Sequence, residues 1–202
     1  FIKHAKYDLN GFFQTEKYFL NIRKILLKEL KPAKMEIDNY CNNYINDIKN
    51  RYPDKEIVAL HNRRGDNVPS KEKYSSLELG VFRNDKDLFH PLMVDEYFDN
   101  AMKIFDNCIF LVFSDTVKDI EWCKKKFKGE NIFFSEKHDD ITDLMLMKNC
   151  DHNIISNSSF SWWGAWLNEN PKKKVCAPKV WFGKAYKNWD TKDLIPENWL
   201  IL

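Results

Sequence analysis

The feature that most constrains the fold is an alternation of short apolar runs with stretches of helical periodicity, which begins at Glu56. A short apolar run is typical of a buried strand, and the periodic stretches are typical of amphipathic helices. The expected strands cover residues 57–61, 109–113, 131–134, 153–155 and 174–178, and the expected helices lie near 95–105, 117–127 and 140–149. This alternation predicts an α/β fold with a Rossmann-like parallel sheet and helices on both of its faces.

Helical segments are also expected before this alternation begins. Apolar residues recur at helical spacing over residues 15–31, which predicts one amphipathic helix, and again over 37–49; Pro32 and Pro53 end the two runs. We therefore expect residues 1–55 to form a helical segment that links to, or packs on, an α/β domain of residues 56–202. Residues 70–88 are polar with weak periodicity, and we expect a long surface loop that orders on ligand binding.

The charge balance and the cysteines narrow the choice of partners. The chain has 32 Lys and Arg residues against 30 Asp and Glu residues, and its net charge of +2 gives no field strong enough to favour nucleic acid. No stretch approaches the roughly 20 apolar residues of a membrane span. The 5 cysteines are scattered without a CxxC spacing, which predicts reduced and mostly buried thiols.

Polar residues follow most of the expected strands, where ligands of open α/β sheets bind. The sharpest signal is the pair Arg63 and Arg64, followed by Gly65 and Asp66. Guanidinium groups are planar forks that match phosphate oxygens two at a time, and a strand end holds them in place. The alternative is a surface arginine pair neutralised by Asp66. His61 has no companion at metal-ligand spacing, so no metal site is expected.

A second polar group follows the expected strand 153–155, in the sequence SNSSF. Ser156, Asn157, Ser158 and Ser159 stand where a strand meets a helix, a position at which free backbone N–H groups and hydroxyls bind phosphate. The alternative is an ordinary helix N-cap. The tryptophans that follow predict a packed core around Gly164, with sugar stacking by one of them as the minor alternative: Trp162, Trp163 and Trp166.

Two acidic residues have similarly open interpretations. Asp115 follows the strand 109–113 and could orient the arginines, bind ligand hydroxyls or cap the next helix, with capping as the default. Asp143 lies near the start of the helix 140–149, where capping again competes with ligand binding. All these groups would meet at one edge of one sheet. Together they predict a phosphate-bearing ligand, a nucleotide derivative, held without metal by arginines and hydroxyls.

Three segments resemble the motifs of a known family. HNRRGD (61–66), FLVFSD (110–115) and DLMLMKNCDHNIISNSSFSWWGAWLN (143–168) closely resemble the three motifs of the α-1,2-fucosyltransferases of glycosyltransferase family 11. GFFQTEKYF (11–19) and APKVWF (177–182) look like further signatures of the family, so the resemblance covers nearly the whole chain. It implies a two-lobed GT-B fold whose C-terminal lobe, here residues 56–202, binds GDP-fucose, and transfer of L-fucose with inversion to a galactose-terminated glycan, without a metal.

The resemblance also implies roles for individual residues. Arg63 would hold the β-phosphate, where a guanidinium stabilises the charge that accumulates on the departing diphosphate. His61 and Asp143 would contact guanine. The diphosphate would be bound by a group at the start of the following helix: Asn157, Ser158, Ser159 and the backbone at Phe160. A supporting group would lie around the arginine loop, with the last of its members near the ribose or the arginines: Arg64, Asp66 and Asp115.

The transfer formally needs a base for the acceptor hydroxyl. Asp66 and Glu72 are the carboxylates near the arginine loop; we expect Asp66 to be structural and take Glu72 as the candidate base, although the base could also lie on another lobe or be absent. The glycine-rich GGLGNQ segment typical of the family's N-terminal lobe does not occur in the chain, which begins at Phe1, and Asn67 replaces an aromatic residue common after RRGD. We therefore expect the chain to be the C-terminal portion of a longer enzyme.

Two alternatives stay open at this point. A transferase with the same donor but another linkage or acceptor would share every motif, and a donor-binding fragment or degenerate relative would bind without turnover. The expected location is cytoplasmic or peripheral to a membrane in a microbe, or the Golgi lumen in a eukaryote with an upstream anchor.

Overall fold

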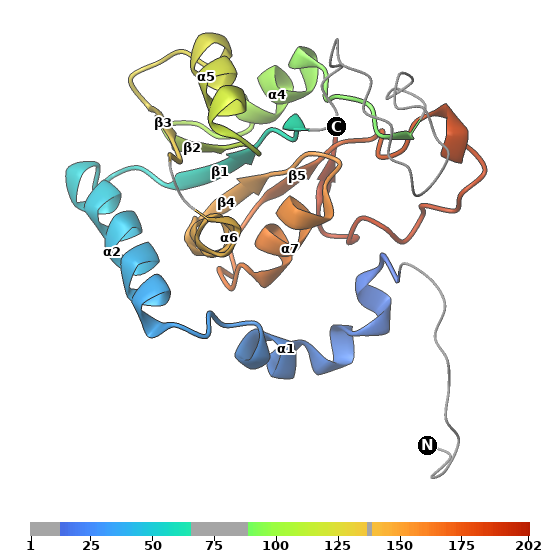
Figure 1. Cartoon of the computed structure of the whole chain (residues 1–202), viewed down its shortest axis with the longest axis horizontal. Helices are drawn as coiled ribbons and strands as arrows, with labels where there is room; N and C mark the ends of the chain where they lie inside the picture. Colours follow the sequence, from blue (N-terminus) through green and yellow to red (C-terminus); the bar gives the residue numbers. More distant parts are fainter. Residues whose placement is uncertain (1–12, 66–88, 137–138) are drawn as a thin grey trace.

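The computed structural model describes residues 13–65, 89–136 and 139–202, and its centre is an open parallel sheet (Figure 1). The six strands lie in the order β3-β2-β1-β4-β5-β6. Their bounds are Ile57–His61 for β1, Ile109–Phe113 for β2, Ile132–Phe134 for β3, His152–Ile154 for β4, Val175–Ala177 for β5 and Leu200–Ile201 for β6. The predicted α/β class is confirmed, and each expected strand is present to within two residues at either end.

Helices cover both faces of this sheet (Figure 1). On one face lie α4 (Asp95–Met102) and α5 (Val117–Lys126); on the other lie α2 (Met35–Arg51), α6 (Asp140–Asn149) and α7 (Ser159–Leu167). Two buried clusters, one on each side, form the core. Every residue of β1 and β2 is buried because both faces of these strands are covered. No helix within the described residues is long and apolar enough to cross a membrane.

The strand order contains a switch point between β1 and β4. The chain runs from β1 outward through β2 to β3, and then returns to place β4 on the other side of β1. The connection after β1 therefore runs toward β2, and the connection after β4 runs toward β5, in the opposite direction along the sheet. This divergence opens a crevice outside the carboxyl ends of β1 and β4. The crevice is where a ligand of such a sheet is expected.

The segment 15–31 does not form the single helix that its periodicity predicts. It is divided into two short 3-10 turns, Glu16–Tyr18 and Leu20–Ile22, followed by α1 (Arg23–Glu29). Phe19 interrupts the helix with φ −139° and ψ 4°. Its ring stacks on Trp163 at 5.1 Å and meets two other indoles edge-on, so burial of this aromatic side chain outweighs the local helical preference. The helix expected over 37–49 is confirmed as the longer α2.

The tryptophans of α7 form the predicted packed core. Trp162 and Trp166 are buried, and their indole N–H groups donate to the Leu194 carbonyl at 2.9 Å and to Glu16 at 2.8 Å. Gly164 instead lies against α6, where an added Cβ would stand 3.0 Å from the Cβ of Met147. This close approach locks α7 onto α6. All five cysteines are buried and free, as predicted.

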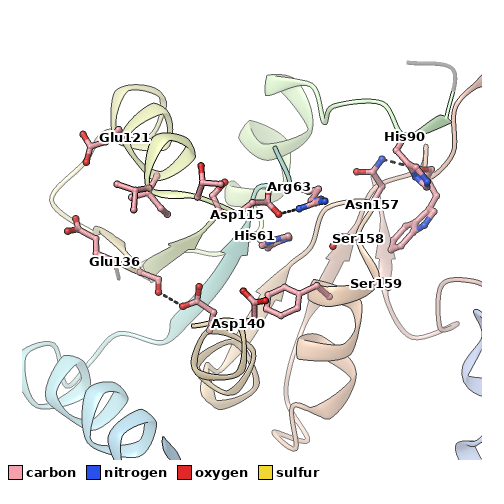
Figure 2. Close-up of a pocket in the computed structure, with 18 of the residues that line it drawn as sticks. His61, Arg63, His90, Asp115, Glu121, Glu136, Asp140, Asn157, Ser158 and Ser159 are labelled. Carbon is pink, nitrogen blue, oxygen red and sulfur yellow. Dashed lines mark hydrogen bonds and ion pairs between the residues drawn. The ribbon is translucent and has the colours of Figure 1, made fainter. Parts of the chain in front are cut away.

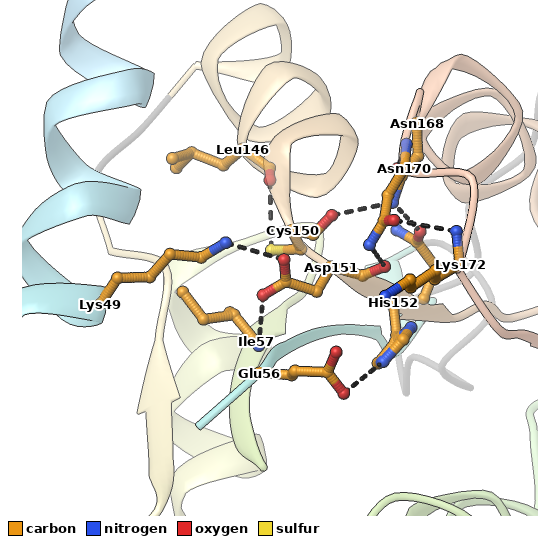
Figure 3. A network of polar contacts seen from close by, with 11 residues as sticks. Lys49, Glu56, Ile57, Leu146, Cys150, Asp151, His152, Asn168, Asn170 and Lys172 are labelled. Carbon is orange, nitrogen blue, oxygen red and sulfur yellow. Dashed lines mark hydrogen bonds and ion pairs between the residues drawn. The ribbon is translucent and has the colours of Figure 1, made fainter. Parts of the chain in front are cut away.

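A polar network fixes the amino end of the sheet, opposite the crevice (Figure 3). Asp151, just before β4, accepts hydrogen bonds from the Lys49 ammonium at 2.7 Å and from the backbone N–H of Ile57 at 2.8 Å. Asn168, just after α7, donates to the Cys150 carbonyl at 2.8 Å. These contacts tie α2, the start of β1 and the end of α7 to β4, so they hold the register of the strands whose other ends line the crevice.

Candidate functional site

A cavity of about 1030 Å³ lies at the carboxyl edge of the sheet, where the crevice is expected (Figure 2). It is lined by residues that follow β1, β2, β3 and β4 and by the first turns of α6 and α7. Most of the residues chosen from the sequence line it: His61, Arg63, Asp115, Asp143, Asn157, Ser158, Ser159 and Phe160. Asp66 and Glu72 lie outside the described residues.

Asp115 fixes the loop that carries the two arginines. Its carboxylate accepts a hydrogen bond from Nη1 of Arg63 and another from the backbone N–H of Arg64, the latter at 2.7 Å. The default interpretation of Asp115 as a helix cap is wrong, because Thr116 caps α5 and accepts the Asp119 N–H at 3.2 Å. The alternative in which Asp115 orients the arginines is confirmed. A guanidinium has five N–H donors, and a single carboxylate cannot accept hydrogen bonds from all of them.

Ser156 holds the same loop from the opposite side. Its hydroxyl accepts a hydrogen bond from the Arg63 N–H at 2.9 Å and donates to the His61 carbonyl at 2.5 Å. It is fully buried and does not line the cavity, so it lies behind the site rather than facing a ligand. Gly65 then turns with φ +31°, and an added Cβ would stand 3.0 Å from both Arg63 Nη1 and Asp115 Cγ.

Arg64 points away from the cavity. Its guanidinium lies 3.6 Å from the centre of the Trp122 ring, and its Nε pairs with Asp119 at 3.4 Å. Both partners belong to α5. Arg64 therefore fastens the arginine loop to this helix, which fits the supporting role that the sequence suggested for it.

The first turn of α7 faces the cavity with hydroxyls and backbone N–H groups. Ser158 occupies the N-cap position, but its side chain makes no capping hydrogen bond. Ser158, Ser159 and Phe160 all line the cavity. A helix N-terminus with uncapped N–H groups beside an arginine attracts an anion, so this corner suits a phosphate group.

His61 and Asp143 lie on different elements that meet at the cavity. His61 is 3% exposed, and burial together with the positive charge of Arg63 lowers its pKa to about 3, which keeps the imidazole neutral. Asp143 does not cap α6, because Asp139 is the N-cap and accepts the Thr142 N–H at 2.9 Å. Instead Asp143 accepts a hydrogen bond from the Ser135 hydroxyl at 2.5 Å.

The two ends of the cavity differ in chemistry (Figure 2). The end nearest α5, β3 and α6 is acidic and is lined by Glu121, Glu136, Asp140 and Asp143. The opposite end is lined by His90, Asn157 and Trp181, and Arg63 lies between the two ends. An acidic wall repels phosphate and accepts N–H donors, so the cavity can hold a ligand with a donor-rich group at one end and an anion in the middle.

Several lining residues were not anticipated from the sequence. Ser135 directly follows the strand 131–134, so reading the residue after every expected strand would have found it. Trp181 lies within the segment APKVWF, which resembled a family signature but suggested no role. His90 carries no local signal, because it does not directly follow an expected strand. Within residues 13–65, 89–136 and 139–202, no three His, Cys, Asp or Glu side chains are grouped to hold a metal.

Comparisons with known proteins agree with this geometry. The family model described as Glycosyl transferase family 11 matches residues 1–202. An alpha-1,2-colitosyltransferase of Escherichia coli is 32% identical over 200 residues, which is 94% of this chain and 60% of that protein. The O-antigen biosynthesis glycosyltransferase WbnK of Escherichia coli is 28% identical over 195 residues, 93% of this chain and 59% of that protein. The chain thus spans about three fifths of the length of these relatives, and it belongs to glycosyl transferase family 11.

Proposed function

We propose that the protein transfers L-fucose from GDP-fucose to a hydroxyl of a galactose-terminated glycan, with inversion and in α-1,2 linkage. The observation that carries the proposal is the pairing of a strand-end arginine with an uncapped helix N-terminus. Arg63, braced by Asp115, lies on the same cavity as the first turn of α7. Together they suit the diphosphate of a nucleotide sugar.

The diphosphate is assigned to this corner. Arg63 contacts the β-phosphate, and Ser158, Ser159 and the backbone at Phe160 donate to the remaining oxygens. Negative charge accumulates on the diphosphate as the glycosidic bond breaks, so fixed donors bind the transition state more strongly than the ground state. No metal is required in this scheme, because the guanidinium and the helix N-terminus supply the positive potential. Arg64, Asp66 and Asp115 support the loop.

Guanine is assigned to the acidic end of the cavity. The carboxylate of Asp143 accepts from the N1–H and the exocyclic amino group of guanine, a donor pair that adenine lacks. Ser135 holds this carboxylate in place at 2.5 Å, and the neutral imidazole of His61 supplies a further polar contact. This arrangement supports selection of a GDP-linked donor over an ADP-linked one.

Glu72 is the proposed base for the acceptor hydroxyl, with Asp66 in a structural role. The donor sugar has a second candidate, and the bacterial relatives also bear on the acceptor and the location. The colitosyl relative favours colitose, the 3-deoxy form of fucose, as an alternative donor sugar. The same bacterial relatives favour a microbial glycan as acceptor and a cytoplasmic or membrane-peripheral location over the Golgi lumen.

The first test is calorimetric titration of the protein with GDP, GDP-fucose and ADP in the presence of EDTA. We expect binding of both GDP ligands, no comparable binding of ADP, and a loss of about tenfold to hundredfold in affinity in Arg63→Ala, since a hydrogen bond to a charged group is removed. Arg51→Ala is the matched control, because this exposed arginine lies on α2, where it donates to the Asp47 carbonyl, and does not line the cavity. ADP binding as tight as GDP binding would contradict the donor assignment.

Turnover is a separate question from donor binding. Release of GDP on addition of a galactose-terminated acceptor, followed by methylation analysis of the product, identifies the acceptor position. A product with another linkage would replace the α-1,2 assignment while keeping the donor. Binding without turnover would favour a donor-binding relative.

A further inference from the structure

The side chain of Asn157 is held in one orientation by its neighbours. Its amide nitrogen donates to the Pro91 carbonyl at 2.9 Å and to the Trp181 carbonyl at 3.1 Å. Only the NH₂ group can donate to two carbonyls, so a flipped amide would lose both bonds. The orientation therefore follows from chemistry, and it leaves the amide oxygen to face the other way.

That oxygen is buried without a hydrogen-bond partner among the described residues. Asn157 is 5% exposed, lines the cavity, and its Oδ1 is one of three such buried atoms in the described part of the chain. Figure 2 shows the amide oxygen turned toward the side on which Arg63 lies. A buried polar atom left unpaired costs about 1 to 3 kcal/mol, so its presence in a cavity calls for a ligand that completes it.

The chemistry of the oxygen limits what that ligand group can be. An amide oxygen accepts hydrogen bonds and donates none, so it repels a fully ionised phosphate oxygen. The earlier expectation that Asn157 binds the diphosphate is therefore unfavourable for this atom. It requires an O–H or N–H donor. His61 Nδ1, a second unpaired atom on the same cavity, does not discriminate in this way, because a neutral imidazole nitrogen can donate or accept.

The position of Asn157 in the cavity selects between the donors of a nucleotide sugar. The N–H groups of the base suit the acidic end, which lies across Arg63 from Asn157. The diphosphate occupies the middle, beside Arg63 and the first turn of α7. The group that remains for the end with His90, Asn157 and Trp181 is the sugar, which carries hydroxyl donors and adjoins the β-phosphate.

On the basis of the proposed function, we propose that Asn157 determines the specificity for the donor sugar by accepting a hydrogen bond from one of its ring hydroxyls. A site built to bond a hydroxyl discriminates strongly against an analogue without it, because the protein atom is then left buried and unpaired. The carbonyls of Pro91 and Trp181 contribute by fixing the orientation of the Asn157 amide.

The test compares GDP, GDP-fucose and the GDP-linked 2-deoxy, 3-deoxy and 4-deoxy analogues of fucose on the wild-type protein by calorimetry. We expect one analogue to bind about tenfold or more weakly than GDP-fucose, while the others lose less. If colitose is the natural sugar, the 3-deoxy analogue is the reference, and the loss falls on the 2-deoxy or the 4-deoxy analogue. Analogues that all bind within about threefold of the reference would overturn the inference.

Asn157→Ala provides the second measurement. We expect the variant to bind the sensitive analogue and the reference donor with about equal affinity, because the variant has no amide oxygen to leave unpaired. Affinity for GDP itself should fall less than affinity for GDP-fucose, since GDP carries no sugar at this end. A penalty that persists in the variant would overturn the inference.

These arms also separate the inference from the function on which it rests. Wild-type protein that does not prefer GDP to ADP would reject both. Selective GDP binding with no sensitive analogue would reject only the role of Asn157. If Asn157→Ala does not fold because the segments of Pro91 and Trp181 are no longer held, the inference is tested by the wild-type series of analogues alone.

Discussion

The hydroxyl of Ser156 joins the end of β4 to Arg63 at 2.9 Å, and the same hydroxyl donates to the carbonyl of His61 at 2.5 Å. Ser156 lies just after β4, and its two bonds reach the backbone at the end of β1, so it links the two strands of the switch point. Asp115 holds the same loop from β2, through the Arg63 guanidinium and the Arg64 N–H. The arginine is thus fixed from both neighbouring strands before any ligand arrives, which reduces the entropy lost on binding.

Ser156→Ala should therefore weaken GDP binding although the side chain does not line the cavity. The variant leaves the part-buried Arg63 N–H and the buried His61 carbonyl without this partner, so the free energy of unfolding should fall by about 1 to 3 kcal/mol. GDP affinity should fall about tenfold as the loop loosens. Urea unfolding and calorimetry measure the two effects.

Ser158→Ala is the matched control for this variant. Its side chain makes no capping hydrogen bond, so its unfolding free energy should change by less than about 0.5 kcal/mol. GDP affinity should fall by direct loss of a phosphate contact. If both serines reduced stability equally, the distinction between a bracing and a ligand-facing hydroxyl would be wrong.

Asp115→Asn should separate the charge of this residue from its shape. The amide can still accept the Arg64 N–H, but it no longer pairs ionically with Arg63. We expect GDP affinity to fall about tenfold, since a charge-assisted hydrogen bond is stronger than a neutral one. Asp190→Asn, in an exposed pair with Lys192, is the control and should leave affinity unchanged. Undiminished GDP affinity in Asp115→Asn would mean that geometry alone positions the arginine.

Gly65→Ala should disturb the same ion pair through the backbone. Gly65 has φ +31°, and a Cβ there would meet both Arg63 and Asp115 at 3.0 Å. Gly129 also has a positive φ, at +151°, but its neighbours are Asn131 and Ile132, which do not line the cavity. Both alanine variants should lose about 1 kcal/mol or more of stability. GDP affinity should fall in Gly65→Ala only, and an equal fall in both would indicate a general effect of unfolding.

The sequence predicted the strands well because each is a short apolar run bounded by polar residues, as in IFLVF followed by SDT. Local patterns could not predict that Phe19 breaks its helix, because the reason is its contact with tryptophans far along the chain. The edge strand β6 was not predicted, although Leu200 and Ile201 lie in the apolar run WLIL (199–202), and both of its residues are exposed.

The location of the site could be predicted from the sequence, but the roles of its individual residues were less predictable. Parallel strands gather their carboxyl ends at one edge, so the polar residues after them had to meet. The roles of Ser156, Asp115 and Asn157 depend on which neighbour each side chain reaches, and residue type alone does not specify this. The length of the motif at 143–168 also has a structural cause, because Cys150, Asp151 and Asn168 fix the far end of the sheet.

The buried imidazole of His61 should make the protein lose stability in mild acid. Its pKa is about 3 in the folded chain, because of burial first and the charge of Arg63 second, against 6.5 for an exposed histidine. Between these values the unfolded chain binds the extra proton, so stability is complete above pH 6.5 and is lost as the pH falls toward 3. At pH 5 the loss from this group should be on the order of 2 kcal/mol. Carboxylates also contribute to acid unfolding, so the measurement is urea unfolding of wild type and His61→Gln across this range; the wild-type free energy should fall more steeply, whereas parallel curves would show that the imidazole becomes charged in the folded protein.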